Sequence, residues 1–216
     1  MPKGTFIMAT VSNGIIIACW ITFLVYWVIS ALRVKATAEH QSAVSAAAHR
    51  IPVGLGWFLL LYQGLPPPMN LVVVPRADWA LALGVVICVF GLFVTIWARW
   101  TLAGNWSSDV TFKQGHELVR SGPYRFVRHP IYTGLLLMCL GSAIEIGRLR
   151  CGLSLVAVGL GFWIKLRQEE RLLLRHFPDT YPAYRQQVNA LVPFGRIQVG
   201  NASGTDGTRV TPQQPR

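Results

Sequence analysis

Apolar residues along this chain of 216 residues gather into blocks instead of alternating with polar ones. A helical block of about 15 to 20 apolar residues is long enough to cross the core of a bilayer. Four blocks are clear. A fifth, shorter block at 53–65 runs into consecutive prolines. The blocks cover residues 14–32, 53–65, 79–97, 131–146 and 151–164. We therefore predict an all-α fold, a multi-pass bundle of about five transmembrane helices.

Composition agrees with a membrane protein, because 52% of the residues are hydrophobic and only 13% are charged. The N-terminal apolar block also resembles a secretory signal, with a small-residue pattern at residues 36–38. However, this block is long for a signal peptide, and its basic flank, Arg33 and Lys35, follows it. The last two blocks are separated only by residues 147–150, which predicts a tight helical hairpin.

The Lys and Arg residues divide unequally between the two sides of a five-span bundle. One side holds four of the twenty, and the other side holds the remaining sixteen. The four are Lys3, Arg76, Arg148 and Arg150. Because basic loops stay in the cytoplasm, this split predicts an N-terminus outside and a C-terminus inside. We expect a bacterial cytoplasmic membrane rather than the endoplasmic reticulum.

The formal net charge of +11 lies mostly on that basic side. No nucleic-acid-binding motif accompanies the charge, so we expect anionic membrane lipids and not nucleic acid as its partners. The four cysteines occur singly, without histidines at ligand spacing, and we expect no metal site. The sequence leaves the oligomeric state open.

Three regions follow from these patterns. Residues 1–99 hold N-terminal transmembrane helices and no motif beyond hydrophobicity. Residues 100–197 combine a cytoplasmic loop, the last two spans and C-terminal helices, and we expect the catalytic region there. Residues 198–216 are rich in Gly, Ser, Thr, Pro and Gln, a composition typical of disorder.

Residues 121–134, SGPYRFVRHPIYTG, place backbone-restricting residues just before an apolar block. Gly122 followed by proline favours a rigid turn. Pro130 suits the first turn of the next helix, and Gly134 leaves room beside that helix one turn later. A charged membrane anchor alone does not need these restrictions. We therefore expect a rigid loop that ends at a helix N-terminus.

Arg128 and His129 lie next to this predicted helix start. The first N–H groups of a helix lack intrahelical partners and carry a partial positive charge, so helix starts bind anions. The sequence therefore predicts an anion site after Pro130. A charged anchor at the membrane surface is the alternative interpretation of the same residues.

A second polar cluster, WIKLRQEERLLLRHF at residues 163–177, follows the last apolar block. If the helix continues through it, Arg167 and Glu170 share one face, while Glu169 and Arg171 point elsewhere. Taken alone, the cluster is typical of a surface helix with ion pairs between neighbouring turns. The predicted hairpin, however, returns it to the same membrane face as the first cluster. We therefore expect a polar pocket at the cytoplasmic mouth of the bundle.

These motifs resemble those of the isoprenylcysteine carboxyl methyltransferase and phospholipid methyltransferase superfamily. The resemblance covers about residues 100–195, the C-terminal half of the chain. It rests on an R-H-P-x-Y-x-G block followed at a specific distance by a pair of glutamates. The matching stretches are LAGNWSSDV (102–110), HELVRSGPYRFVRHPIYTG (116–134), Glu169-Glu170, HFPDTYPAY (176–184) and Val192-Pro193.

The resemblance implies an integral membrane methyltransferase that uses S-adenosylmethionine, enclosed by the last two spans and the C-terminal segment. The helix start suits the carboxylate of the cofactor, a glutamate suits its ribose or ammonium, and tyrosines suit its adenine or sulfonium. The candidate cofactor-binding residues are Arg128, His129, Pro130, Tyr132, Gly134, Glu169, Glu170, Tyr181 and Tyr184. No Gly-rich βαβ fingerprint is present, so the sequence excludes the soluble methyltransferase fold.

The methyl acceptor decides which side chains act in catalysis. An isoprenylcysteine-type carboxylate needs only an orienting cation, for which Arg167 or Arg171 is the candidate. A phospholipid amine or a phenolic lipid benefits from a general base, for which Glu170 is the candidate. Sterol-reductase-like NADPH oxidoreductases resemble the same C-terminal region and form an alternative of another class. A membrane scaffold without a cofactor is the third hypothesis.

Overall fold

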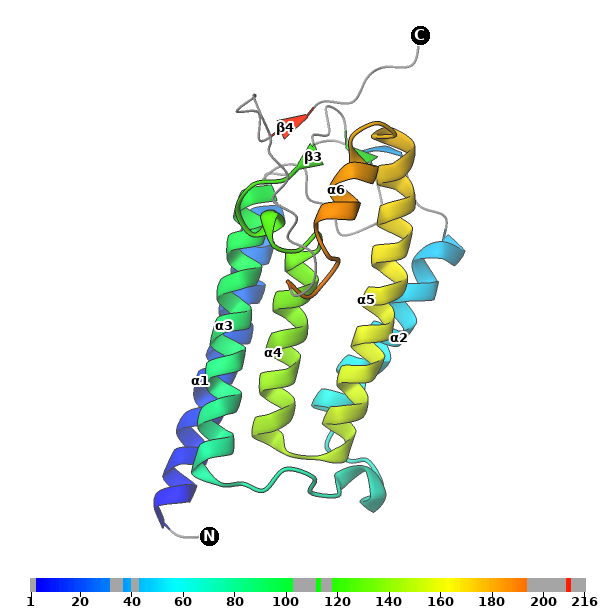
Figure 1. The fold of residues 1–216 in the computed structure, drawn as a ribbon. Helices are drawn as coiled ribbons and strands as arrows, with labels where there is room; N and C mark the ends of the chain where they lie inside the picture. The colour runs from blue at the N-terminus through cyan, green and yellow to red at the C-terminus, as the bar shows by residue number, and fades with distance from the viewer. Residues whose placement is uncertain are drawn as a thin grey trace.

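The computed structural model describes residues 3–31, 37–39, 43–102, 112–113, 118–193 and 209–210. Five long helices run side by side as a bundle, and a short sixth helix lies at one end (Figure 1). The prediction of a helical bundle is confirmed. The helices are α1 (Lys3–Ala31), α2 (Ala43–Leu61), α3 (Asp78–Leu102), α4 (Pro130–Ile146), α5 (Leu149–His176) and α6 (Tyr181–Gln187).

Short elements occupy the connections between the helices. In the described part of the chain, the 3-10 turns η1 (Pro67–Asn70) and η3 (Gly122–Arg125) precede α3 and α4 respectively. Two antiparallel strand pairs join β1 (Thr37–Glu39) to β2 (Phe112–Lys113) and β3 (Leu118–Val119) to β4 (Arg209–Val210). The expected disordered tail, residues 198–216, is described only at β4. Most of the motif at 102–110 also lies outside the described residues.

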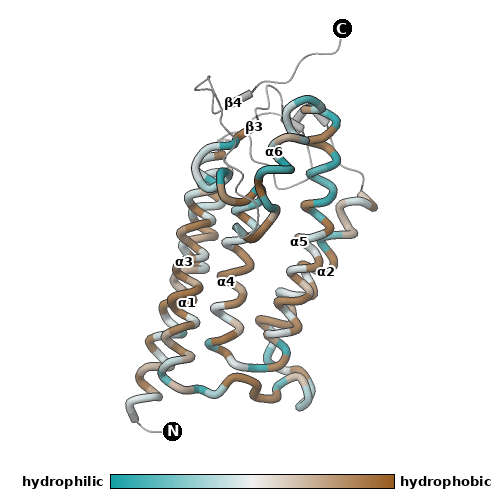
Figure 2. Tube along the Cα trace, viewed as in Figure 1, coloured by the Kyte–Doolittle hydropathy of each residue, from teal (hydrophilic) through white to brown (hydrophobic). Residues whose placement is uncertain are grey.

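Four described helices, α1, α2, α3 and α5, are long and apolar enough to cross a membrane. Helix α4 has 17 residues, and at 1.5 Å per residue it is about 26 Å long, slightly less than a typical hydrocarbon core. Figure 2 shows hydrophobic residues along the bundle and hydrophilic ones concentrated toward its ends. The five predicted blocks therefore correspond to four full candidate spans and one shorter apolar helix beside them.

Several helix boundaries differ from the sequence expectation, and α1 begins at Lys3, before the predicted start at residue 14. Helix α2 begins at Ala43, about three turns before the apolar block at residue 53, and contains Pro52 within it. It ends at Leu61, before the prolines, so the uncertain block is the second half of a complete helix. Helix α5 continues to His176, well beyond the predicted end at residue 164. This extension carries the second polar cluster out of the apolar part of the bundle.

Helices α3 and α4 pack most closely because glycines let their backbones approach each other. A Cβ atom on Gly91 would lie 2.6 Å from the carbonyl oxygen of Gly134, and one on Gly84 would lie 2.7 Å from that of Gly141. A side chain on Gly134 would also collide with Thr95. The room that Gly134 leaves beside α4 is therefore filled by α3.

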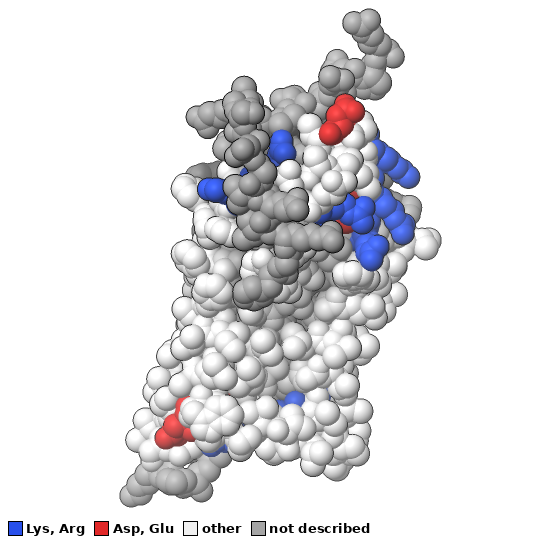
Figure 3. All heavy atoms as spheres, viewed as in Figure 1, with Lys and Arg blue, Asp and Glu red and all other residues white. Residues whose placement is uncertain are grey.

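The predicted hairpin between the last two spans is confirmed. Gly147 ends α4 with a φ of +69°, a left-handed conformation that favours glycine, and α5 begins at Leu149. The hairpin places the start of α4 and the end of α5 at the same end of the bundle as α6 (Figure 1). On the face shown in Figure 3, Lys and Arg side chains gather at this end.

Candidate active site

The backbone around residue 128 brings the loop before α4 against the chain that follows α6. Val127 forms a parallel β-bridge with Asn189. The N–H of Arg128 donates to the carbonyl of Asn189 at 2.8 Å, and the N–H of His129 donates to Ala190 at 3.0 Å. These bonds fix the two side chains at the start of α4, facing the last turns of α5. The positions of the motifs in space therefore depend on a segment about 60 residues later in the chain.

Arg128 forms the centre of the site. Its Nε and Nη2 atoms donate to Oε1 of Glu170 at 2.9 and 2.6 Å. Its Nη1 atom donates to the carbonyls of Arg185, at 3.1 Å, and Val188. The side chains of Arg128 and Glu170 are only 9% and 5% exposed. A buried pair of this kind is held by charge-assisted hydrogen bonds, and removal of either partner leaves an uncompensated charge.

His129 connects this pair to a second glutamate. Its Nε2 atom lies 3.4 Å from Glu170 Oε1, and its Nδ1 atom lies 3.5 Å from Glu169 Oε2. The hydroxyl of Tyr132 donates to Glu169 Oε1 at 2.5 Å, and its ring stacks on the imidazole at a centroid distance of 5.6 Å. We call Arg128, His129, Glu169 and Glu170 the ionic cluster. It joins the R-H-P block to the glutamate pair, as the sequence predicts.

The protonation of His129 reflects two opposing effects. Burial disfavours the charged ring, but hydrogen bonds and attraction from Glu169 and Glu170 outweigh it and raise the pKa of His129 above its usual value. The imidazolium form is therefore favoured. In that form the ring donates a proton toward a carboxylate on each side, and the ionic cluster holds two cations and two anions.

We expect this pKa shift to make stability pH-dependent. A raised folded-state pKa means that His129 stabilises the fold fully below its unfolded pKa of about 6.5. The contribution is lost as pH rises through the higher folded-state pKa. In detergent, the unfolding temperature of His129→Gln should therefore fall furthest below wild type near pH 6. The difference in unfolding temperature between wild type and the variant should narrow toward pH 9. A difference that widens as pH rises would contradict the charged form of His129.

Two tyrosines of α6 lie in the packed layer behind the ionic cluster. Tyr184 donates its hydroxyl to the carbonyl of Tyr124 at 2.6 Å, so it has a structural role in joining α6 to η3. Tyr181 is 1% exposed, and among the described residues its hydroxyl has no hydrogen-bond partner. Burial raises the pKa of Tyr181, and the negative charge of Glu170 raises it further. Tyr181 thus keeps a protonated polar group available at the site.

Two cations of the site were missed by the sequence interpretation. Lys165 places its Nζ atom 5.5 Å from the ring centroid of Tyr132, and Arg185 places its Nε atom 3.5 Å from Glu170 Oε2. The position of Lys165, one helical turn before Glu169, is a signal that could have found it. Arg185 carries no comparable signal, because its role depends on how α6 folds back onto α5.

The candidate arginines of α5 lie outside the ionic cluster. Arg167 is exposed, and its guanidinium lies 4.5 Å from the ring centroid of Trp163. Arg171 is also exposed. Glu169, a cofactor-binding candidate expected on a different face from Glu170, belongs to the ionic cluster. The reason is the rotation of α5, whose packed face includes both glutamates and leaves the two arginines on the outside.

The expected anion site at the start of α4 also changes. Pro130 is the first residue of the helix, as predicted, and is buried. The N–H groups of Arg128 and His129 just before it are already bonded to carbonyls of residues 189 and 190. The Arg128 guanidinium is paired with Glu170 and two carbonyls, so it positions the site and does not offer a free cation. Gly134 contacts α3 and belongs to helix packing.

The fold and the site together define a helical membrane protein with a buried ionic cluster at one end of the bundle. Residues 79–180 match the phospholipid methyltransferase family. The resemblance predicted from the motifs is therefore confirmed. The matched region includes α3, α4, α5 and all four residues of the ionic cluster.

Curated relatives carry a more specific name. The chain is 29% identical over 122 residues to protein-S-isoprenylcysteine O-methyltransferase of Homo sapiens, a match covering 55% of this chain and 43% of that protein. The enzyme of the same name from Tribolium castaneum is 30% identical over 122 residues, 54% of this chain and 42% of the relative. The enzyme of the same name from Schizosaccharomyces pombe is 33% identical over 83 residues, which cover 37% of this chain and 34% of the relative. The chain thus spans less than half the length of these relatives.

Proposed function

We propose that the protein is an S-adenosylmethionine-dependent methyltransferase of the membrane, whose acceptor is the carboxylate of a lipophilic, isoprenylcysteine-type molecule. The observation that carries the proposal is the ionic cluster. It unites the R-H-P block and the glutamate pair at one end of the apolar bundle, within the family region at residues 79–180. The names of the relatives support the choice of a carboxylate acceptor.

The residues at the site fit the methyl donor. The Tyr181 hydroxyl is buried and has no partner among the described residues, so it is available to a polar ligand. Glu169 has a side chain that is 24% exposed, and it suits the ribose hydroxyls or the ammonium of the cofactor. The ring of Tyr132, whose hydroxyl is bonded to Glu169, suits adenine or sulfonium. Glu170, already paired with Arg128, holds these groups in place.

When bound, the cofactor supplies a methyl group that passes from sulfonium sulfur to a carboxylate oxygen, while sulfur keeps the bonding electrons and no proton moves. The protein then needs to align the acceptor and exclude water, but not to remove a proton. Lys165 and Arg185 lie next to the ionic cluster and can orient a carboxylate. We assign this role to them in place of Arg167 and Arg171, which point away.

The alternative acceptors make a different demand on Glu170. A phospholipid amine or a phenol needs a base to take its proton. Glu170 bonds to Arg128 and lies within 3.5 Å of His129 and Arg185, and this cationic surrounding stabilises its ionised form and makes it a weak base. The geometry therefore favours a carboxylate, which needs no base.

The test is transfer of a labelled methyl group from S-adenosylmethionine by the purified protein in lipid nanodiscs. We expect labelling of N-acetyl-S-farnesylcysteine, and the product should release volatile methanol in alkali because it is an ester. Phosphatidylethanolamine and a phenolic lipid serve as competing acceptors. Alkali-stable label on either would overturn the carboxylate assignment. Binding of NADPH without binding of S-adenosylmethionine would support the reductase alternative instead.

We further propose that the end of the bundle with the ionic cluster faces the cytoplasm of a bacterial cell. The gathering of basic side chains at this end supports the orientation. A reporter fused after Arg196 should therefore read cytoplasmic. A reporter inserted between η1 and α3, at Val73, should read the opposite compartment. The reverse pair of signals would contradict the proposed orientation.

A further inference from the structure

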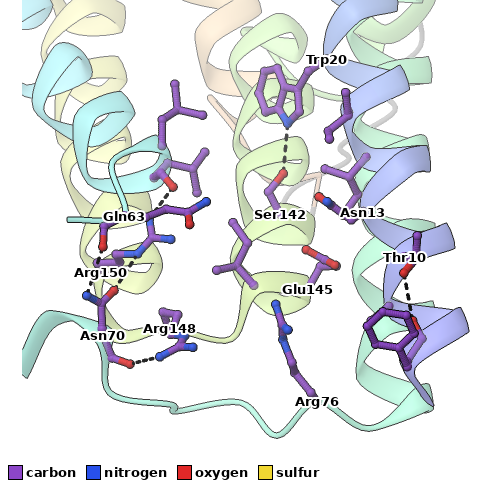
Figure 4. A pocket seen from close by; sticks show the side chains of 17 residues that line it. Thr10, Asn13, Trp20, Gln63, Asn70, Arg76, Ser142, Glu145, Arg148 and Arg150 are labelled. Atoms are coloured by element: carbon purple, nitrogen blue, oxygen red, sulfur yellow. Dashed lines mark hydrogen bonds between the residues drawn. The ribbon is translucent and has the colours of Figure 1, made fainter. Parts of the chain in front are cut away.

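A second polar region lies at the end of the bundle away from the ionic cluster. There, α1, the end of α2, the segment between α2 and α3, and the α4–α5 hairpin line an open cavity of about 780 Å³ (Figure 4). Neither the proposed methyl transfer nor any motif of the sequence accounts for it. The polar residues of its lining include Asn13, Asn70, Ser142 and Glu145 together with three arginines.

The charge of the cavity is its most unusual property. Arg76, Arg148 and Arg150 line it against one acidic residue, Glu145, so the lining carries a formal excess of two positive charges. The sequence assigns only four Lys and Arg residues to this side of the membrane, and three of them line this cavity. Basic residues are disfavoured on a non-cytoplasmic side, and their concentration at one cavity therefore indicates a binding role.

The three arginines are not equivalent. Arg150 is buried and donates from Nη1 to the carbonyls of Leu59 and Leu60, at 2.8 and 2.5 Å, so it caps the end of α2. Arg148 donates from Nη1 to the carbonyl of Asn70 at 2.6 Å and is partly exposed. Arg76 is exposed, and its guanidinium points toward Glu145 in Figure 4. Arg76 and Arg148 are thus the cations that a ligand can reach.

Apart from Thr10, Gln63 and the polar residues named above, the lining is apolar, and it is long. The residues that α1 contributes recur every three or four positions, which places them along one face of the helix. They are Phe6, Ala9, Thr10, Asn13, Ile16, Ile17 and Trp20. From Phe6 to Trp20 this face extends about 21 Å, more than half of a hydrocarbon core of about 30 Å. Trp20 ends the cavity by contacting Trp57 of α2, with ring centroids 4.8 Å apart. A small soluble anion would leave most of this surface empty.

We propose that the cavity binds an anionic phospholipid of the leaflet opposite the ionic cluster. Its phosphate would lie at Arg76 and Arg148, and an acyl chain would lie along the apolar face of α1 toward Trp20. A charged end next to a long apolar wall is the chemistry of an amphiphile. The site is separate from the methyltransferase proposal, so its test does not depend on activity.

The experiment uses the purified full chain in nanodiscs that contain a trace of photoreactive phosphatidylglycerol, with the reactive group on the acyl chain. After irradiation, labelled peptides are mapped by mass spectrometry. We expect label on α1 residues 6–17 that falls at least fivefold in Arg76→Gln. Arg175→Gln removes an equally exposed arginine from the other end of the bundle and should leave this label unchanged. Equal elution volume and unfolding temperature of both variants verify folding.

Three results would overturn the proposal. Label spread evenly over the lipid-facing residues of α1 and α3, without response to Arg76→Gln, would show only general contact with the bilayer. Equal labelling by a photoreactive phosphatidylcholine would remove the requirement for a net negative charge. Displacement of the probe by soluble glycerol phosphate as effectively as by unlabelled phosphatidylglycerol would identify a site for small anions and not for lipid.

Discussion

Replacing Glu170 by Gln is expected to weaken S-adenosylmethionine binding by about 100-fold or more, and to lower the unfolding temperature as well. Gln keeps the shape of the side chain but leaves the buried guanidinium of Arg128 without its counter-charge. Breaking a buried pair in this way costs about 3–5 kcal/mol of folding stability. If about 3 kcal/mol of the lost positioning is carried over to cofactor binding, affinity falls by about 100-fold. Cofactor affinity, single-turnover transfer and thermal unfolding measure the three consequences.

The pattern of these losses separates the roles of Glu170. A general base would lose transfer by about 10²- to 10⁴-fold while cofactor binding stayed intact. A residue that only stabilises the fold would lose unfolding temperature but not affinity. We expect affinity to fall first, because Glu170 positions Arg128 and His129. Asp179→Asn, a change of an exposed carboxylate beyond α5, is the matched control and should behave as wild type.

A double replacement provides a sharper comparison. Arg128→Met combined with Glu170→Leu removes both charges and leaves no uncompensated ion in the buried site. Apolar substitutes for a buried ion pair are often neutral or stabilising, so the unfolding temperature should recover toward wild type. Cofactor binding should stay lost, because the groups that position the site are gone. Recovery of both properties would reduce the pair to a structural contact.

Gly134→Ala is expected to destabilise the bundle strongly. Its new methyl group would collide with Thr95 and with the backbone of Gly91 on α3. Overpacking of a tight core typically costs about 1–3 kcal/mol, and here the obstacle includes backbone that cannot rotate away. We expect a lower unfolding temperature in detergent and a larger aggregated fraction on extraction.

Gly152→Ala provides the matched control for this change. A Cβ atom at Gly152 has no neighbour within 4 Å among the described residues, and the residue lies inside α5. Ala is favoured over Gly in a helix by about 1 kcal/mol, so this variant should be as stable as wild type or more stable. If both substitutions had the same effect, helix propensity rather than α3–α4 packing would control stability.

The sequence was sufficient to predict the bundle, because its apolar blocks are long and clearly separated. It was less successful for helix α2, whose first three turns contain Ala, Ser, His and Arg instead of a continuous apolar run. Packing against α5 explains why this part is helical, since Gly161 of α5 lies against the backbone of His49. A contact between segments more than 100 residues apart leaves no local signal.

The candidate site was also predicted only in part. The hairpin and the two polar stretches were enough to bring Arg128 and His129 close to the glutamate pair. They were not enough to predict the direction of each side chain on α5, because helical spacing alone does not say which face packs inward. This is why Arg167 and Arg171 were candidates for the site although the structure leaves both exposed. The position of Lys165 follows once the packed face is known.

The contacts of Arg128 also have a consequence for a truncated chain. Two of its acceptors are carbonyls of Arg185 and Val188, and its own N–H is bonded to Asn189. All five long helices therefore precede, in the chain, the residues that hold Arg128 in the ionic cluster. A chain cut after residue 180 would contain every long helix but would leave Arg128 without these bonds. Membrane insertion and completion of the site thus depend on different parts of the sequence.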